Sequence, residues 1–292
     1  MTFDGYFIYD IYLPDITQNQ HPDYLCEEHS SSWGSGANVT LEDDTTIYMT
    51  RTASLKAVSS GADDIYYYPS GQNLAQDMTG ADCLCFWVRA NVTNAIRVSI
   101  HTDGTHYLYK DHTITTGNIW EFVIVKFSDM TDSDTFDITD VNYIQIDHKN
   151  SNRTLYLDLY AVGRLFEIDL ISSISISRDL NLETMSSFFR AGDIVIPFGL
   201  HSNIYNLAFE VINQETESKT PQQLIDEVNI IHKYFVRREP LIFHAEPGDL
   251  KMDLMRGRAI YPLSRKFTWN PGTICDYPFT LPFMEYDNAD MS

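Results

Sequence analysis

Leu155-Tyr-Leu-Asp-Leu-Tyr160 reads as a β-strand that carries a carboxylate between apolar neighbours, and it completes a longer pattern. Two strand-like runs precede it, Cys85-Phe-Trp-Val-Arg-Ala90 and Ile119-Trp-Glu-Phe-Val-Ile-Val-Lys126. Over residues 23–163, such short apolar or alternating runs are separated by Gly, Asn, Asp and Ser, at a spacing of roughly 8–12 residues that is typical of an all-β sandwich. The sequence therefore predicts one sandwich domain over this range.

Three earlier pieces belong to the same pattern: Asp23-Tyr-Leu-Cys-Glu-Glu28, Trp33-Gly-Ser-Gly36 and Thr52-Ala-Ser-Leu-Lys-Ala57. As an ordered set, the pieces resemble the jelly-roll carbohydrate-binding modules of secreted glycan enzymes, modules that also occur in phage tail proteins. The resemblance covers about half of the chain. It implies a jelly-roll β-sandwich that contacts a glycan.

The resemblance also implies a metal. In such modules an Asp on the last strand binds a structural calcium together with a Glu near the first strand, and the matching residues here are Asp158 and Glu27. Calcium takes 6–8 oxygen ligands, often including backbone carbonyls. The apolar flanks of Asp158 predict a partly buried carboxylate, which is costly without a partner. The alternatives are that Asp158 pairs with an Arg or Lys, or faces solvent.

Tyrosines supply the candidate sugar contacts, because aromatic faces pack against the C–H side of a pyranose ring while nearby polar groups bind its hydroxyls. Strand alternation places Tyr66 and Tyr68 on one face and Tyr67 on the other. By the same rule Tyr107 and Tyr109 share a face, beside a loop that contains Gly and His. We predict glycan contacts at Tyr66, Tyr68, Tyr107 and Tyr109.

Other chemistry-bearing residues receive structural interpretations. Trp87 and Trp120 lie within very apolar runs and are expected in the core. His101, His106 and His112 lie near one another in sequence but lack metal-ligand spacing, so we expect a solvated hairpin. The four cysteines show no C-x-x-C and are interpreted as reduced core residues.

From residue 164 onward the pattern changes to that of an α+β domain. A helix is predicted over residues 220–235, where Thr220 is the N-cap, Pro221 is the first helical residue and apolar residues recur at spacings of three and four. The layout resembles the tail-tube and distal tail proteins of siphoviruses, a β-sandwich flanked by one helix. The ending Lys266-Phe-Thr-Trp-Asn-Pro-Gly272, followed by Tyr277-Pro-Phe-Thr-Leu-Pro-Phe-Met-Glu285, is similar to the C-terminal strand region of those proteins.

The predicted organisation has three parts: residues 1–22, 23–163 and 164–292. The first contains the strand-like Gly5-Tyr-Phe-Ile-Tyr-Asp-Ile-Tyr-Leu-Pro14, followed by a polar connector. This strand is too apolar to stay unpaired in solvent. Pairing with the last part, instead of with the sandwich, would make the sandwich an insertion.

Charge restricts the partners. The net charge is −21, and residues 1–160 carry 8 Lys or Arg against 23 Asp or Glu, a net of −15. Such a chain repels phosphate backbones, so we expect no nucleic-acid partner. No stretch approaches the length and apolarity of a membrane span.

The predicted function is structural rather than enzymatic, because the sequence has no G-x-S-x-G, H-E-x-x-H or Walker motif. The two resemblances together imply a virion protein of a tailed virus, at the tail tip, in the baseplate or as a minor tail protein. Its partners would be copies of itself and other tail proteins, and its outward jelly roll would serve decoration or attachment to a host glycan. The absence of a signal peptide agrees with assembly in the host cytoplasm. The alternative is a non-viral glycan-binding accessory protein of a cell surface.

Overall fold

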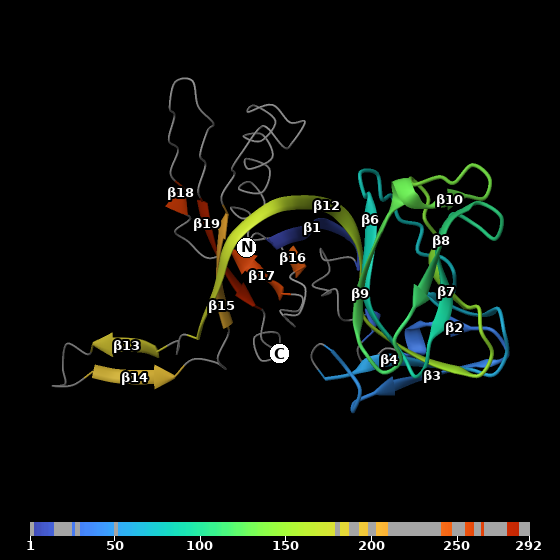
Figure 1. The fold of residues 1–292 in the computed structure, drawn as a ribbon, viewed down its shortest axis with the longest axis horizontal. Coiled ribbons are helices and arrows are strands. Elements are labelled where there is room, and N and C mark those ends of the chain that lie inside the picture. Colours follow the sequence, from blue (N-terminus) through green and yellow to red (C-terminus); the bar gives the residue numbers. More distant parts are fainter. Residues whose placement is uncertain are drawn as a thin grey trace, which may run out of the picture. The chain divides into compact units, whose positions relative to one another are not determined.

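A computed structural model describes residues 3–14, 25–26, 30–49, 52–178, 182–186, 193–197, 203–209, 241–246, 255–259, 264–265 and 279–285. The chain forms two compact units: one consists of Met1–Tyr9 and Phe166–Ser292, the other of Asp10–Leu165. Figure 1 shows the second of these, here called the sandwich unit, as two layers of strands.

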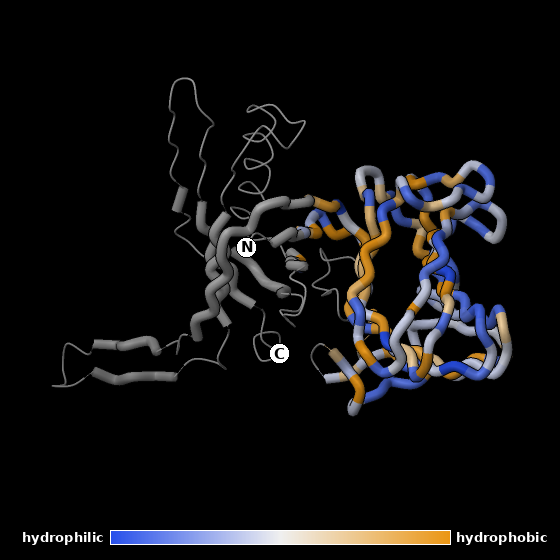
Figure 2. The backbone as a smooth tube through the Cα atoms, viewed as in Figure 1, coloured by the Kyte–Doolittle hydropathy of each residue, from blue (hydrophilic) through white to orange (hydrophobic). Residues whose placement is uncertain are grey.

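The first sheet of the sandwich unit has the strand order β3, β4, β12, β6, β9, with every neighbouring pair antiparallel. These strands are β3 (Val39–Asp44), β4 (Ser54–Ser59), β12 (Arg153–Arg178), β6 (Cys83–Ala90) and β9 (Glu121–Lys126). Nearly every side chain of β6 is buried, as expected for a continuous apolar run that is covered on both faces. Figure 2 shows strongly hydrophobic segments along β6 and β9.

The second sheet has six strands in the order β10, β8, β7, β11, β5, β2, again antiparallel throughout. These are β10 (Thr131–Asp132), β8 (Tyr107–Ile114), β7 (Asn94–His101), β11 (Tyr143–His148), β5 (Asp64–Tyr68) and β2 (Gly34–Ser35). Along β7 and β11 most inward side chains are isoleucines and valines, with the buried His148 and Asn94 at the ends of the same face, and the outward side chains are polar or aromatic. This alternation is the period-2 pattern of a sheet that buries one face.

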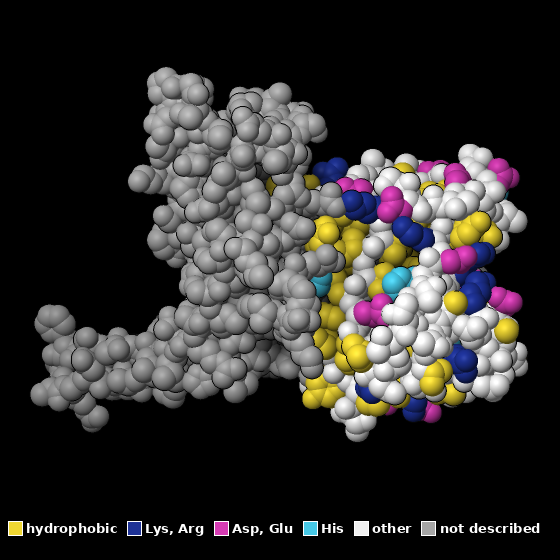
Figure 3. Space-filling view, viewed as in Figure 1, with side chains coloured by type: hydrophobic (Ala, Val, Ile, Leu, Met, Phe, Trp, Pro, Cys, Tyr) yellow, Lys and Arg dark blue, Asp and Glu magenta, His cyan; other side chains and the backbone are white. Residues whose placement is uncertain are grey.

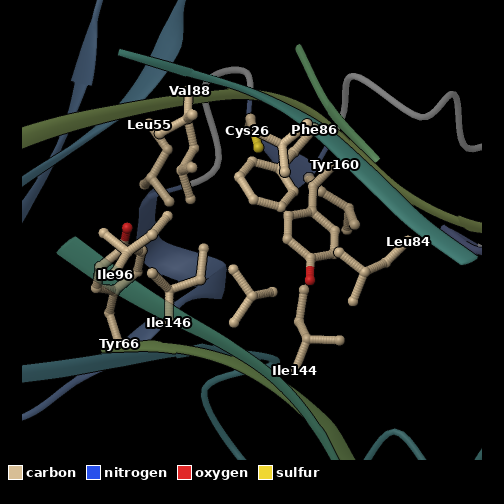
Figure 4. Packing of buried hydrophobic residues seen from close by; sticks show 14 of the residues in the cluster. Cys26, Leu55, Tyr66, Leu84, Phe86, Val88, Ile96, Ile144, Ile146 and Tyr160 are labelled. Atoms are coloured by element: carbon tan, nitrogen blue, oxygen red, sulfur yellow. The ribbon is translucent and has the colours of Figure 1, made fainter. Parts of the chain in front are cut away.

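The core lies between the two sheets. Leu55 and Val88 of the first sheet face Ile96, Ile144 and Ile146 of the second (Figure 4). All five are fully buried, and each such side chain contributes on the order of 1.5–3 kcal/mol of transfer free energy. This packing holds the two layers together.

Aromatic rings fill the wider part of the same core. Phe86 and Tyr160 stack with ring centroids 5.3 Å apart and planes at 5° (Figure 4). Trp33 contacts Tyr160, Tyr66 and Tyr68, at centroid distances of 6.4, 5.9 and 5.6 Å. The indole N–H of Trp33 donates to a backbone carbonyl, so its polar atom is satisfied inside the core.

A bulge interrupts β12. The register with β6 shifts between Asp158 and Ala161, and Leu159 adopts a positive φ of 49°. Leu157 points into the core before the bulge, and Tyr160 points into it afterwards. The extra residue therefore resets the alternation, as β-bulges do, and leaves Asp158 on the outer side of the sheet.

In the other unit, the first part of β1 (Phe3–Leu13) pairs antiparallel with β16 (Leu241–Glu246), with Tyr6 opposite His244. Further along this sheet come β17 (Met255–Ala259), β19 (Phe279–Glu285), β15 (Asn203–Phe209) and the second half of β12, with β18 (Ser264–Arg265) beside β19. β13 (Leu182–Ser186) and β14 (Asp193–Pro197) form a separate hairpin.

The architecture confirms a mainly β protein with two sheets packed as a sandwich. The predicted helix over residues 220–235 lies outside the described residues. Where the structure describes the chain, no helix is long and apolar enough to cross a membrane.

Candidate functional site

The structure separates the predicted tyrosines into two groups. Tyr66 is fully buried, and Tyr68 is half-buried where it packs against the core; the rings of both contact Trp33. The side chains of β5 alternate as predicted. The face that carries Tyr66 and Tyr68, which we predicted to contact the sugar, is however the one that faces the core. Tyr67, which points the other way and is half-buried, takes their place on the surface. Tyr107 and Tyr109 are also half-buried and outward, with ring centroids 5.8 Å apart.

Four rings form a row on the outer face of the second sheet, one from each of four neighbouring strands. Tyr143, His101 and Tyr107 lie directly opposite one another in the ladder of β11, β7 and β8. His101 stacks on Tyr143 at 4.3 Å and 14°, and on Tyr107 at 4.6 Å and 24°. Tyr67 of β5 meets Tyr143 at 6.2 Å and 65°. We call this set the aromatic row.

His101 holds the centre of the aromatic row and is only 3% exposed. One ring nitrogen, Nδ1, lies 3.1 Å from the backbone oxygen of Asp103, so it carries the proton and donates. The other, Nε2, lies 2.8 Å from the hydroxyl of Ser99 and accepts from it. Burial lowers the pKa of His101 to about 4, so the ring is neutral at pH 7. The expected solvated hairpin is thus wrong for His101.

A polar row lies beside the aromatic row on the same face. Arg97 forms a two-pronged ion pair with Asp111, at 2.7 and 3.0 Å, and its guanidinium lies 4.1 Å from the centroid of Tyr109. The hydrogen bond from Arg97 lowers the pKa of Asp111. The amide of Gln145 donates to Asp147 at 2.7 Å. These planar groups are pre-oriented for hydrogen bonding.

The positively charged side chains of this face are already paired with carboxylates. Lys149 lies 2.9 Å from Asp63 and 3.3 Å from Asp147, and Arg97 is paired with Asp111. The surrounding unit is strongly acidic, and charges of both signs are interspersed on the side of it that Figure 3 shows. The face therefore offers hydrogen bonds and ring surfaces but no spare positive charge among the groups described here.

The other histidines of the predicted hairpin sit at the surface in separate pairs. His106 contacts Asp103 at 2.7 Å, and this hydrogen bond raises the pKa of His106. His112 contacts Glu121 at 3.3 Å. Within the described ranges no group of three or more His, Cys, Asp or Glu side chains gathers as a metal site would require.

Of the two proposed calcium ligands, Asp158 lies within the described residues. Asp158 is fully buried, and its carboxylate accepts a hydrogen bond of 2.8 Å from the backbone N–H of Met49. It also lies close enough to Cys26 to raise the pKa of that thiol, after burial itself. Glu27 lies outside the described residues. A buried, oriented carboxylate is compatible with a hard cation, which requires oxygen donors.

Trp87 and Trp120, both expected in the core, differ in their burial. Trp87 is 4% exposed but lies on the outer side of the first sheet, with its ring 5.2 Å from Phe122. Trp120 is half-buried next to the exposed Ile119, so the expectation of a core position is wrong for Trp120.

No protein-family model and no curated protein matches the chain. Among solved structures, the chain is similar to the family 11 carbohydrate-binding module from Clostridium thermocellum, in complex with a β-1,3-1,4-mixed-linked tetrasaccharide, with 14% identity over 55% of this chain and 96% of that one, at a TM-score of 0.38. It is also similar to the family 30 carbohydrate-binding module of a cellulosomal cellulase from the same organism, with 14% identity over 46% and 91% of the two chains, at a TM-score of 0.37. A third similarity, to the agarase AgWH50C, has 12% identity over 46% of this chain and 24% of that one, at a TM-score of 0.36. At these identities and TM-scores the similarities do not decide the function, which has to be inferred from the residues of the site.

Proposed function

We propose that the sandwich unit binds an uncharged glycan across the outer face of its second sheet. The observation that carries this proposal is the aromatic row, in which the half-buried Tyr67 and Tyr107 flank the buried Tyr143 and His101 beside a row of pre-oriented planar polar groups. Rings bind the C–H face of a sugar, and amides, carboxylates and guanidinium groups bind its hydroxyls.

Rigidity supports the same proposal. Tyr107 is stacked on His101, whose two nitrogens are both hydrogen-bonded, so little side-chain entropy remains to be lost on binding. Tyr109 is braced from one side by Arg97. A surface that is already ordered binds a weakly interacting ligand such as a sugar better than a mobile surface does.

Charge supports an uncharged ligand over an acidic one. The lysine and arginine of the face are paired with carboxylates, and residues 1–160 carry a net charge of −15. A glycan rich in phosphates or carboxylates would be repelled. Affinity for the proposed ligand should therefore change little with ionic strength.

The test uses the full chain on an array of neutral and acidic oligosaccharides, followed by calorimetry with the β-1,3-1,4-mixed-linked tetrasaccharide as first probe. Tyr109→Ala and Tyr67→Ala should each weaken binding by up to about tenfold, the value of one lost ring contact. Tyr48→Ala is the matched control, because Tyr48 is 43% exposed and lies outside this face. Binding confined to acidic glycans, or unaffected by both face variants, would overturn the proposal.

The role of the whole chain is a further part of the proposal. The resemblance of residues 164–292 to tail proteins supports a repeated subunit of a virus tail, without catalysis, that carries the sandwich unit outward. The pairing of β1 with β16 returns the N-terminal strand to the unit that contains Phe166–Ser292, which is the connectivity of an inserted domain. Electron microscopy of the purified chain should then show rings or filaments, and single separate molecules at high concentration would contradict it.

A structural calcium at Asp158 and Glu27 also belongs to this proposal. Asp158 supplies a buried carboxylate held by Met49, and the ion would stabilise the sandwich unit without touching the glycan.

A further inference from the structure

An exposed apolar patch lies at the turns that join β6 to β7 and β8 to β9. Ile119 is 57% exposed and Val92 is 40% exposed. These are two of the three large hydrophobic side chains that the described part of the chain exposes, and the half-buried Trp120 is adjacent in sequence to one of them. Single exposed apolar residues are ordinary, but a contiguous group of them rimmed by polar side chains is a candidate interaction site.

Aromatic and cationic side chains meet at this patch on the outer face of the first sheet. Tyr156 of β12 lies opposite Arg89 of β6 in the ladder, and both lie outside the core cluster. Arg89 is half-buried, whereas Tyr156 is only 8% exposed. The ring of Trp120 meets that of Tyr156 edge-on, at 6.5 Å and 63°. The guanidinium of Arg89 lies 5.6 Å from the centroid of the same tyrosine.

The turn that carries Trp120 is fixed by its own hydrogen bonds. The backbone N–H of Asn118 donates to Ala90 at 2.7 Å, and its side-chain amide donates to the carbonyl of Asn91 at 3.1 Å. Its amide oxygen accepts from Arg89 at 3.4 Å. Gly117 admits no side chain, because a Cβ there would lie 2.9 Å from the backbone of Val92. The amide, the guanidinium and the indole are therefore held in one arrangement.

We infer that Trp120, Arg89 and Asn118, held in place by the buried ring of Tyr156, form a second glycan contact that is separate from the aromatic row. Aromatic rings beside an amide and a guanidinium are the chemistry that binds a sugar ring together with its hydroxyls. The inference takes its ligand class from the proposed function but concerns a different surface.

The patch and the aromatic row lie on opposite faces of the sandwich unit. The aromatic row lies on the outer face of the second sheet and the patch on the outer face of the first. The outer faces of two stacked sheets point in opposite directions, across layers about 10 Å apart. One short glycan does not reach both, so the two contacts would engage different chains or distant parts of one polymer and raise the avidity of the unit.

The experiment measures the full chain on a dense array of neutral oligosaccharides that includes the β-1,3-1,4-mixed-linked tetrasaccharide. Four proteins are compared: the natural chain, Trp120→Ala, the double variant Tyr67→Ala/Tyr109→Ala, and the triple variant. We expect residual signal in the double variant and none in the triple variant. Trp120→Ala alone should lower retention on the dense array at least about tenfold, as expected when avidity is lost.

Ile119→Ser serves as a second variant at the patch, because its exposed side chain is not needed for folding. It should lower retention in the same direction. Tyr48→Ala, at an exposed ring elsewhere, should leave every signal unchanged.

Two results would overturn the inference. If the double variant loses all signal while Trp120→Ala and Ile119→Ser match the natural chain, the patch binds no glycan and the proposed function stands. If the natural chain gives no signal on any neutral glycan, both proposals fail together.

Discussion

His101 lies parallel to Tyr143, with ring centroids 4.3 Å apart and planes 14° from each other. The two residues come from strands about forty positions apart in sequence, and they are brought together because β7 and β11 are direct neighbours in the second sheet. On its other side His101 stacks on Tyr107. The imidazole thus acts as a spacer that keeps two tyrosines in place.

Removing the imidazole of His101 should destabilise the sandwich unit and make the tyrosines of the aromatic row more mobile. His101→Ala should lower the free energy of unfolding by about 2–4 kcal/mol, because a buried ring is lost and a cavity remains. It should also weaken glycan binding, since Tyr107 loses its support. Urea unfolding and calorimetry measure the two effects. His101→Phe restores a flat ring and should recover most of the binding; equal binding by the Ala and Phe variants would show that the stack has no role in recognition.

Acid should destabilise the sandwich unit in a defined window. Burial lowers the pKa of both His101 and His148 from 6.5 to about 4. The unfolded chain therefore binds protons before the folded one, so stability is complete above pH 6.5 and falls as the pH drops toward 4. Each histidine contributes up to about 3 kcal/mol. Urea unfolding at pH 7.5, 5.5 and 4.5 should show the loss.

The matched control for this window is the double variant His101→Phe/His148→Phe, which should lose most of the pH dependence. His106 acts with the opposite sign, because Asp103 raises its pKa, and its contribution is lost as the pH rises. A stability curve that is flat between pH 7.5 and 4.5 in the natural chain would contradict the prediction.

Two buried hydroxyls should be dispensable. The hydroxyl oxygens of Tyr66 and Tyr160 are buried without a hydrogen-bond partner in the part of the chain that the structure describes. Burying an unpaired polar group costs about 1–3 kcal/mol. Tyr66→Phe and Tyr160→Phe should therefore leave stability unchanged or raise it by up to that amount, as read from denaturant midpoints. Clear destabilisation would mean that each hydroxyl has a partner in solution. Because neither ring reaches the surface, glycan binding should not change.

Calcium can be tested through Asp158. If the ion is bound there, a chelator should lower the melting temperature of the natural chain, and added calcium should restore it. Asp158→Ala should be insensitive to both. It should also lose about 1–3 kcal/mol of stability in any buffer, because the N–H of Met49 is left without its acceptor. Identical melting of the natural chain with chelator and with calcium would rule the ion out.

The sequence predicts the strands of the sandwich unit because their signal is local. The apolar run Cys85–Ala90 lies in β6, and the alternating run before Lys126 lies in β9. Alternation also predicts that the side chain of Tyr67 points to the opposite face from those of Tyr66 and Tyr68. Which face is the core is not a local property, however. Tyr66 and Tyr68 face inward because Trp33, far away in sequence, packs against them.

The aromatic row and the direction of the Asp158 side chain cannot be predicted from the sequence, because they too depend on non-local structure. A neutral, buried His101 requires Tyr143 as its neighbour, and that pairing depends on the order of strands in the sheet. Asp158 points outward, although Tyr160 two positions later points inward, because one extra residue is inserted at Leu159. Hydrophobic patterns do not reveal such an insertion, because both flanks are apolar.

The bulge also decides where β12 tolerates a change of length. Before Leu159 the odd-numbered positions face the core, and after it the even-numbered positions do. Deleting Leu159 should therefore leave Leu157 and Tyr160 facing the core, because the remaining residues would alternate as in a regular strand. Deleting Tyr156 instead would reverse the alternation on one side of the deletion and turn the apolar side chains of that half out of the core. A deletion of one residue should thus be tolerated at Leu159 and not at Tyr156.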